Sequence, residues 1–298
     1  MPAKKIKRSV GETVGTVLNY TIITIVVVAC LYPFLNVLAY SFSGNRPILS
    51  GEVTFYPIEF QLESIATTLR KRDIWMSMST TIFVTVVGTI LGLVLTIGAA
   101  YALSKHRLKG RYAITLFLMF TMYFSGGMIP TFLLVKDLKL LDTVWALILP
   151  SAMNVFNFIV MRTFFSQLPE SLEEAAILDG CNDITCLIKI VLPLSMPIIA
   201  TIGLFYAVSY WNDYFTSLLY ISDPDKFTLQ LKLRQLIFTE ELNQLNSANA
   251  TGEGLGQQVM PESLKMASIV VSTIPIILVY PWLQKYFVKG VMVGSVKG

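Results

Sequence analysis

The sequence is poor in charged residues, and this shortage limits the class of protein that it can encode. Asp, Glu, Lys and Arg make up only 14% of its 298 residues, whereas 54% of them are hydrophobic. A soluble domain carries about 25% charged residues. A chain with so few charges is expected in a lipid bilayer rather than in water, so membrane spans are counted here instead of domains.

Residue types that support other functions are scarce as well. The one histidine, His106, excludes a histidine-rich metal site, and three scattered cysteines argue against a disulfide framework. The net charge of +4 is small, and no basic-aromatic pattern predicts binding to nucleic acid. The phosphate-binding sequence G-x-x-x-x-G-K-[ST] does not occur. We therefore expect no metal, no cofactor and no catalytic residue in this chain.

Long apolar runs are what the sequence has instead. A membrane helix needs about 20 mostly apolar residues, and it must be helical because lipid offers no hydrogen-bond partner to the backbone. The predicted fold is all-α, an integral membrane protein whose six transmembrane helices occupy 14–288. The six stretches are 14–42, 76–103, 112–135, 144–165, 194–220 and 265–288.

Basic residues gather beside two of these stretches. Lys or Arg occupies four positions in 4–8 and four in 105–111. Because cytoplasmic loops carry the excess of Lys and Arg, the N-terminus (1–13) and the C-terminal tail (289–298) are predicted to be cytoplasmic. The polar segment at about 166–193, between the fourth and fifth stretches, then lies on the same side.

This polar segment has the signals of two short helices. Pro169 suits a first helical turn, and the acidic residues after it favour the positive end of a helix. Gly180 can take the left-handed conformation that ends a helix, and Asn182 or Asp183 can cap a second one. Pro193 and Pro197 predict a break before the fifth stretch. From these residues alone the segment is as much a solvated connector as a docking surface for another protein.

The same segment resembles the EAA loop of permease subunits in binding-protein-dependent ABC importers. The matching residues are Glu174, Ala175, Ala176, Asp179, Gly180, Ile190, Leu192 and Pro193. The flanking "NVFNFIVMRTFF" and "YWNDYF" and the final "QKYFVKGVMVGSVKG" resemble the carbohydrate-uptake class, in particular its shorter, maltose-type subunit. "SGGMIPTFLLVKDLKLLDT" is similar to the branch associated with complex oligosaccharides.

The resemblance implies a function and a set of partners. The chain would form half of the translocation path for a sugar, an oligosaccharide, delivered by an extracellular binding protein. Its other partners would be a second homologous permease, two ATPase subunits that bind ATP and Mg, and membrane lipid. The expected location is the bacterial inner membrane.

The resemblance also assigns roles to residues. Glu174 would make the ionic contact with the ATPase, Ala175 and Ala176 would pack closely against it, and Gly180 would form the turn between the two helices. When the ATPases close on ATP, the docked helices would move with them and turn the spans from inward-facing to outward-facing. The tail residues expected near the ATPase dimer interface are Gly290, Gly294 and Lys297.

Polar and aromatic residues inside the spans are candidates for the sugar path, because sugars stack on aromatic rings and hydrogen-bond to amides and carboxylates. The candidates are Tyr123, Asn154, Asn157, Tyr210, Trp211, Asn212, Asp213 and Tyr214. Asn154 and Asn157 are three residues apart, which predicts a shared helix face. Such residues also join helices to one another, at about 0.6 kcal/mol each, and the family's longer partner subunit would hold most of the sugar.

Two glycines, Gly88 and Gly92, form a G-x-x-x-G pattern in the second stretch. Small residues at this spacing let helices approach closely. We expect the approach to occur inside this subunit rather than between two copies of it.

Other classes of membrane protein fit less well. A secondary transporter or channel would need charges at the bilayer midplane or an inverted repeat, and an intramembrane enzyme would need a catalytic pair. The sequence shows neither. An importer for amino acids or peptides is the main rival, and the carbohydrate class is favoured by Arg162-x-Phe-Phe and Trp211-Asn-Asp.

Overall fold

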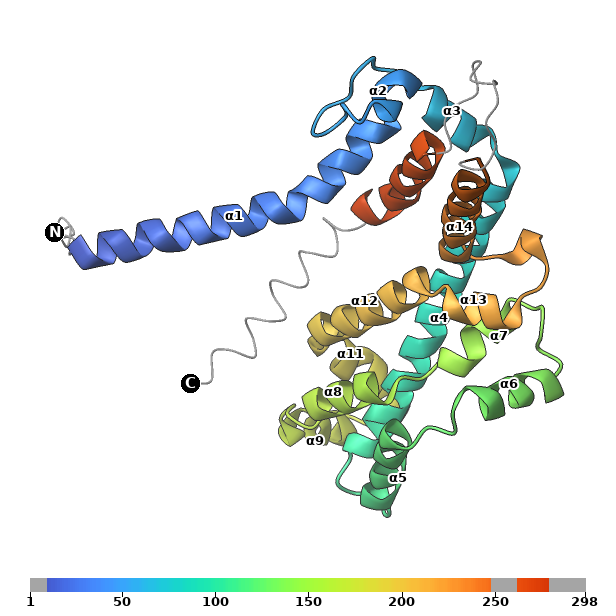
Figure 1. The fold of residues 1–298 in the computed structure, drawn as a ribbon. Helices are drawn as coiled ribbons and strands as arrows, with labels where there is room; N and C mark the ends of the chain where they lie inside the picture. Colours follow the sequence, from blue (N-terminus) through green and yellow to red (C-terminus); the bar gives the residue numbers. More distant parts are fainter. Residues whose placement is uncertain (1–9, 248–261, 279–298) are drawn as a thin grey trace. The chain divides into compact units, whose positions relative to one another are not determined.

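The computed structural model describes residues 10–247 and 262–278, and the secondary structure in these ranges is helical (Figure 1). This confirms the all-α expectation for the described part of the chain. The elements are α1 Val10–Ser41, α2 Asn45–Leu49, α3 Glu63–Arg70, α4 Arg72–Ser104, α5 Arg111–Tyr123, α6 Met128–Asp137, α7 Trp145–Ile148, η1 Leu149–Ser151, α8 Val155–Phe165, α9 Glu170–Leu178, α10 Asp183–Cys186, η2 Leu187–Val191, α11 Leu192–Leu194, α12 Met196–Asn212, α13 Phe215–Tyr220, η3 Pro224–Lys226 and α14 Leu229–Ser247, followed by a helix at 262–278.

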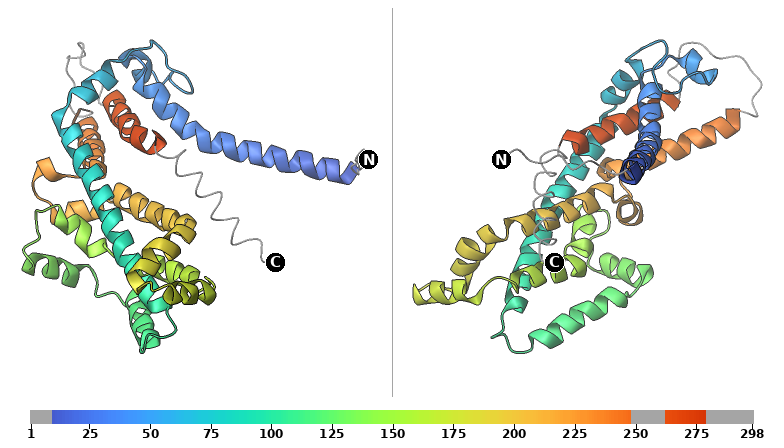
Figure 2. Two further views of the ribbon diagram at one scale, coloured as in Figure 1. Left: turned by 180° about the vertical axis from the view of Figure 1, so that it is seen from behind. Right: turned by 90° about the vertical axis from the view of Figure 1, so that its left-hand side faces the viewer.

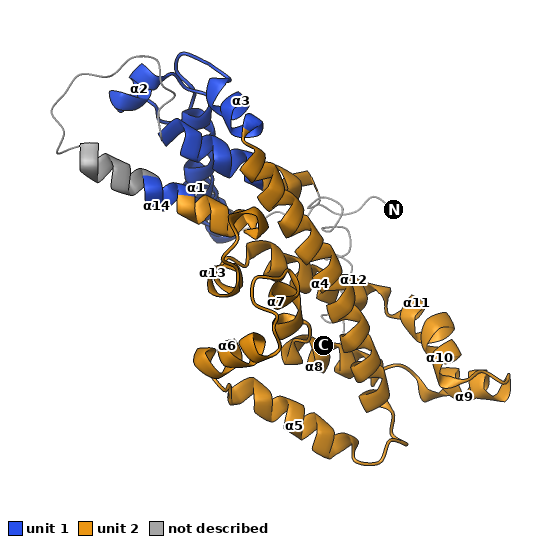
Figure 3. Cartoon of the chain, turned by 90° about the vertical axis from the view of Figure 1, so that its right-hand side faces the viewer, with its two compact units in different colours: residues 1–70, 236–272 blue, residues 71–235, 273–298 orange. Residues whose placement is uncertain are grey.

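The chain divides into two compact units, coloured separately in Figure 3. Unit 1 comprises residues 1–70 and 236–272, and unit 2 comprises 71–235 and 273–298. In unit 1, α1 is apolar around its whole circumference, and most of its large side chains are exposed, as suits a helix surrounded by lipid. A hydrogen bond of 3.0 Å between Ser64 Oγ and Ser263 Oγ joins α3 to the helix at 262–278.

Unit 2 is built around α4, which packs against α12 and α8 (Figures 1 and 2). The residues between these helices form one continuous core, in which Phe158, Met161 and Ile202 are completely buried. One side of each helix is therefore buried against the other two.

Three of the predicted spans are not straight helices. Residues 112–135 form α5 and α6, which meet at 112°, and residues 144–165 bend by 50° between η1 and α8. The 86° bend where α11 meets α12 lies at the start of the fifth stretch, where a break was predicted, but the stretch itself is interrupted between α12 and α13. A single helix over each of these ranges was the wrong expectation. For the sixth stretch, 262–278 is helical, and 279–288 lies outside the described residues.

Each bend has a local cause. Between α5 and α6, Gly127 has φ of +88°, a value that glycine tolerates because it has no Cβ. Before α8, Asn154 is extended, and its side chain caps the new helix. Before α12, Ser195 leaves helical geometry next to Pro197, which confirms the predicted break.

Two tyrosines of α12 satisfy backbone groups that the bend before α8 leaves free. The hydroxyl of Tyr206 accepts a hydrogen bond of 2.9 Å from the backbone N–H of Asn154 and pairs with Thr96 Oγ1 at 2.7 Å. The hydroxyl of Tyr210 donates to the carbonyl oxygen of Ile148 at 3.1 Å. Because lipid offers no such partners, these bonds make a bent backbone tolerable inside a membrane.

The rings of the same tyrosines lie against the two glycines of the G-x-x-x-G pattern. A Cβ added to Gly88 would stand 2.6 Å from the ring of Tyr210, and one added to Gly92 would stand 3.0 Å from the ring of Tyr206. The expectation that these glycines permit close packing inside the subunit is confirmed. Gly98, on the same helix, has nothing within 4 Å of its added Cβ.

In unit 2, the carboxylate of Asp142 joins the loop before α7 to the loop after α13. Asp142 Oδ1 accepts hydrogen bonds from the backbone N–H groups of Asp223 and Ser222, at 3.0 and 3.1 Å. These two donors hold the pKa of Asp142 below its usual value, so the group is ionised at neutral pH. Lys226 Nζ lies 3.2 Å from Asp223 Oδ2 and donates to the carbonyl oxygen of Asp142 at 3.0 Å. The loop before α7 is thereby joined to the loop after α13.

Replacing Gly88 by alanine is predicted to destabilise the subunit, because the new methyl group would overlap the Tyr210 ring. Overpacking of this kind costs about 1–3 kcal/mol. The measurement is the apparent Tm of the complex purified in detergent. Gly98→Ala is the matched control, and it should leave the Tm unchanged or raise it. Equal effects of the two substitutions would contradict the packing assigned to Gly88.

Candidate functional site

The candidate site is the polar segment between α8 and α12, whose local structure follows from its sequence. Helix α9 begins after Pro169 with Glu170 and Glu173 in its first turn. It ends in a Schellman motif, in which Gly180 N–H donates to Ile177 and Cys181 N–H donates to Ala176. Gly180 has φ of +81°, as the turn requires, and this confirms the predicted helix stop.

The second helix begins with a side-chain cap. Asn182 Oδ1 accepts a hydrogen bond of 2.8 Å from the backbone N–H of Thr185, so Asn182 rather than Asp183 is the capping residue. After α10 the backbone widens into a π-helix, η2, a rare geometry that nothing in the sequence signalled. The chain then passes through α11 to the 86° bend before α12.

One side of the segment belongs to the core of unit 2. Ala176, Cys186 and Val191 are 5%, 2% and 1% exposed, and they join the cluster that contains Tyr101 and Leu103 at the end of α4. The segment is therefore packed onto the end of α4 rather than suspended in solvent. Its buried side chains therefore belong to the same core as those of α4.

The remaining surface of the segment is exposed and carries apolar as well as polar side chains. The exposed side chains that we group as the coupling face are Glu174, Ile177, Leu178, Ile184 and Ile188. Leu178 is 88% exposed and Ile184 is 69% exposed. Exposed apolar side chains gathered on a polar segment are typical of a protein–protein contact. Ala175 is exposed beside them, whereas its neighbour Ala176 is buried in the chain's own core.

The two adjacent glutamates of α9 have different surroundings. Glu173 forms an ion pair with Lys105 and is 24% exposed. Glu174 is exposed, and it forms no hydrogen bond or ion pair within the described ranges. Only Glu174 is therefore available to a basic residue of another protein.

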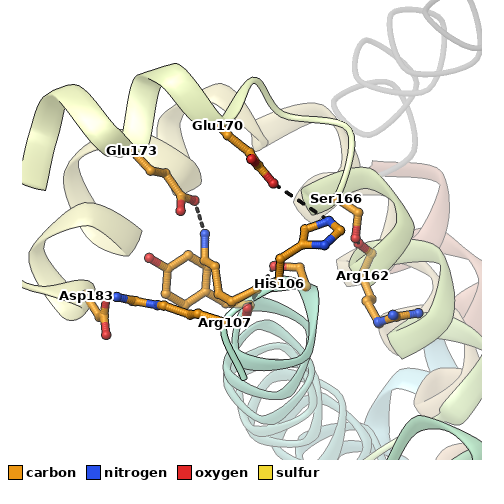
Figure 4. Close-up of polar contacts among 10 residues, drawn as sticks. His106, Arg107, Arg162, Ser166, Glu170, Glu173 and Asp183 are labelled. Carbon is orange, nitrogen blue, oxygen red and sulfur yellow. Dashed lines mark hydrogen bonds and ion pairs between the residues drawn. The ribbon is translucent and has the colours of Figure 1, made fainter. Parts of the chain in front are cut away.

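Three consecutive residues after α4 contact acidic residues of the segment (Figure 4). Lys105 pairs with Glu173, and Arg107 pairs with Asp183. His106 Nε2 lies 3.7 Å from Glu170 Oε1. We call Lys105, His106 and Arg107 the basic triplet. Its members were read in the sequence only as a signal of membrane orientation and as an argument against a metal site.

The candidate path residues are divided between exposed and buried positions. Asn157 and Tyr210 are buried, and the hydroxyl of Tyr210 is already bonded to Ile148. Asn154 is exposed and caps α8, which begins at the next residue. Asn154 therefore lies outside the helix, and it does not share a helix face with Asn157 as the spacing predicted. Tyr123, at the end of α5, is 74% exposed.

The remaining candidates lie where α12 ends. Trp211 is 9% exposed, and its indole N–H has no hydrogen-bond partner in the described part of the chain. Asn212 is exposed, and its side-chain amide donates to Val208. Asp213 accepts a hydrogen bond from the backbone N–H of Thr216. The ring of Tyr214 lies 4.5 Å below the guanidinium of Arg234 on α14.

The tail residues Gly290, Gly294 and Lys297 lie outside the described residues. Their expected contact with an ATPase interface therefore stays a prediction.

Comparison with known proteins places this arrangement among transport proteins. Residues 88–293 match the family described as "Binding-protein-dependent transport system inner membrane component". The polygalacturonan/rhamnogalacturonan transport system permease protein YtcP of Bacillus subtilis is 46% identical over 281 residues, which cover 94% of this chain and 97% of that protein.

Two further likenesses are weaker in sequence but similarly extensive. The arabinooligosaccharides transport system permease protein AraQ of Halalkalibacterium halodurans is 26% identical over 90% of this chain and 91% of that protein. A chain of a bacterial ABC transporter involved in the import of the acidic polysaccharide alginate is 34% identical, with a TM-score of 0.87 over 95% of this chain and 100% of that one. The chain thus belongs to the family of inner membrane components of binding-protein-dependent transport systems.

Proposed function

We propose that this chain is a permease subunit of an ATP-driven importer and forms half of the path by which an oligosaccharide crosses the bacterial inner membrane. The observation that carries the proposal is 46% identity, along 94% of the chain, to a permease named for polygalacturonan and rhamnogalacturonan transport. The relatives named for arabinooligosaccharides and alginate support the same substrate class. They favour it over amino acids and peptides.

The proposed membrane arrangement has six spans with both termini in the cytoplasm. Two described helices, Val14–Ser41 and Arg72–Ser104, are long and apolar enough to cross a membrane, and the bent pairs at 111–137 and 145–165 can each serve as one span. The fifth span would contain α12, with Asp183–Leu194 outside the membrane as part of the polar segment. The helix at 262–278 would begin the sixth. The basic residues of 4–8 and 105–111 support a cytoplasmic N-terminus, with the coupling face proposed to lie on the same side.

The coupling face is proposed to dock on an ATPase subunit. Its apolar side chains would be covered there, and Glu174 would pair with a basic residue of the ATPase. The exposure of Glu174 and its lack of a partner within the described residues support this role. ATP and Mg would be bound by two such ATPase subunits, because this chain contains no phosphate-binding loop sequence. A second permease and an extracellular binding protein would complete the importer.

The proposed sugar path passes the end of α12. The indole of Trp211 offers an aromatic face and an N–H that finds no partner in the described residues, and a buried unpaired N–H costs about 1–3 kcal/mol. A sugar hydroxyl that accepts from this N–H would remove the penalty. Asn212 and Tyr214 are proposed to line the same path, while Tyr210 and Asn157 would support it from within the core.

The substrate class is tested by reconstituting the importer with its cognate binding protein in proteoliposomes loaded with ATP. We expect uptake of oligosaccharides, tested with oligogalacturonides and arabinooligosaccharides, and no uptake of amino acids or short peptides. Peptide uptake without sugar uptake would refute the carbohydrate assignment.

Glu174→Lys is predicted to prevent docking of the ATPase, because it places a positive charge where the partner supplies one. The readouts are ATPase recovered with the tagged permease, and uptake. Gln167→Lys also introduces a lysine, with a change in net charge of one unit instead of two, at an exposed position before α9, and it should retain both. A Glu174→Lys complex with normal ATPase content and uptake would refute the docking role.

Trp211→Phe is predicted to weaken sugar transport with little effect on assembly, because it keeps an aromatic ring, although a smaller one, and removes the N–H. Loss of one hydrogen bond of about 0.5–1.5 kcal/mol corresponds to a rise in KM of roughly 2–13-fold. Trp211→Ala should reduce uptake further, but it also leaves a cavity. Unchanged uptake kinetics in both variants would show that Trp211 is not on the path.

A further inference from the structure

We propose that the basic triplet, Lys105 to Arg107, is a positioning element that transmits movement of the coupling face to α4. The inference rests on the proposed function, because it concerns how a docked ATPase would move the spans. It assigns to Lys105, His106 and Arg107 a role in coupling that is separate from docking.

The contacts of the triplet reach both short helices of the segment. Lys105 and His106 contact Glu173 and Glu170 on α9, and Arg107 pairs with Asp183 on α10 (Figure 4). Three adjacent residues of one loop therefore hold α9 and α10 together. A displacement of either helix must displace this loop, and the loop follows directly on the last turn of α4.

Lys105 makes the strongest of these contacts. Its side chain is only 16% exposed, and its ammonium lies 4.0 Å from the centre of the Tyr101 ring as well as against Glu173. Burial lowers the pKa of Lys105, because desolvation disfavours the charged ammonium. The Glu173 carboxylate and the Tyr101 ring both face this ammonium and oppose that effect. Arg107 and His106 are 56% and 69% exposed, so the Arg107–Asp183 ion pair and the contact of His106 with Glu170 contribute less.

The end of α4 is also fixed to the helix that enters the segment. The carbonyl oxygen of Leu103 has no partner inside a helix that ends at Ser104, and it accepts a hydrogen bond of 2.9 Å from Arg162 Nε near the end of α8. Beneath the ion pairs, Ala176 and Cys186 pack in one core with Tyr101. The ends of α4 and α8 and the two short helices thus form a single block.

This block explains why the triplet would matter for transport and not only for folding. The apolar contact alone can hold the segment near α4, but it is not directional and permits sliding. Ion pairs to two separate helices fix its orientation. When the coupling face moves with the ATPase, a segment whose orientation relative to α4 is fixed moves α4 by the same amount. A segment that can slide along the end of α4 moves α4 by less.

The test compares Lys105→Glu with Lys109→Glu in the complete importer. Lys109 lies in the same loop, is exposed, and forms no ion pair within the described ranges, so the two variants have the same net charge. We expect Lys105→Glu to keep its ATPase subunits but to transport several-fold less sugar per ATP hydrolysed. Lys109→Glu should match the unmodified importer.

A charge exchange tests the pair itself. Lys105→Glu combined with Glu173→Lys should restore a large part of the sugar transported per ATP, because the ion pair is re-formed with its direction reversed. Normal coupling in Lys105→Glu alone would overturn the proposal. Loss of the ATPase subunits from Lys105→Glu, not restored by the exchange, would also overturn it, because the residue would then be needed for docking or folding.

These results are distinguishable from a failure of the proposed function. If the unmodified chain brings down no ATPase, or transports no sugar, the importer assignment itself fails. If the unmodified chain does both and Lys105→Glu is normal, only the role of the triplet is refuted.

Discussion

The packing of α4, α8 and α12 depends on the need of every backbone N–H and C=O group in a membrane to find a hydrogen-bond partner within the protein. A bend inside a span frees N–H and C=O groups that lipid cannot satisfy. At the bend before α8 these groups are met by the hydroxyls of Tyr206 and Tyr210, whose rings reach that position only because Gly92 and Gly88 have no side chains. One set of contacts therefore permits the bend, closes the distance between α4 and α12, and determines where their ends lie.

The position of the coupling segment follows from this packing. The buried side chains of the polar segment belong to the core formed by α4, α8 and α12, so the packing of these three helices determines the orientation of the segment. Its remaining surface carries exposed apolar side chains among polar ones. Glu173 and Glu174 differ in their surroundings, one paired with Lys105 and the other exposed, because successive residues of a helix point in directions about 100° apart.

Local features of the fold could be read from the sequence, and features that depend on distant contacts could not. The glycine stop at Gly180, the polar cap before α10 and the close packing at Gly88 are local or periodic signals, and they were predicted correctly. The bends inside the third and fourth stretches and the break between α12 and α13 were not predicted, because an apolar run has the same composition whether its helix is straight or broken. The internal use of Tyr210 and the pairing of Lys105 join residues far apart in the chain, and no spacing rule reveals such partners.

The turn held by Asp142 has a consequence for binding on its side of the molecule. Its backbone is fixed from two loops at once, by N–H groups of Ser222 and Asp223 and by the ammonium of Lys226. A protein that binds to a flexible loop restricts the conformations of that loop, and the lost conformational entropy weakens the complex. Here the restriction already exists in the free subunit. The surface around this turn is therefore preorganised. The affinity of any protein that binds there would depend on its shape and charge, with little entropy lost in ordering the two loops.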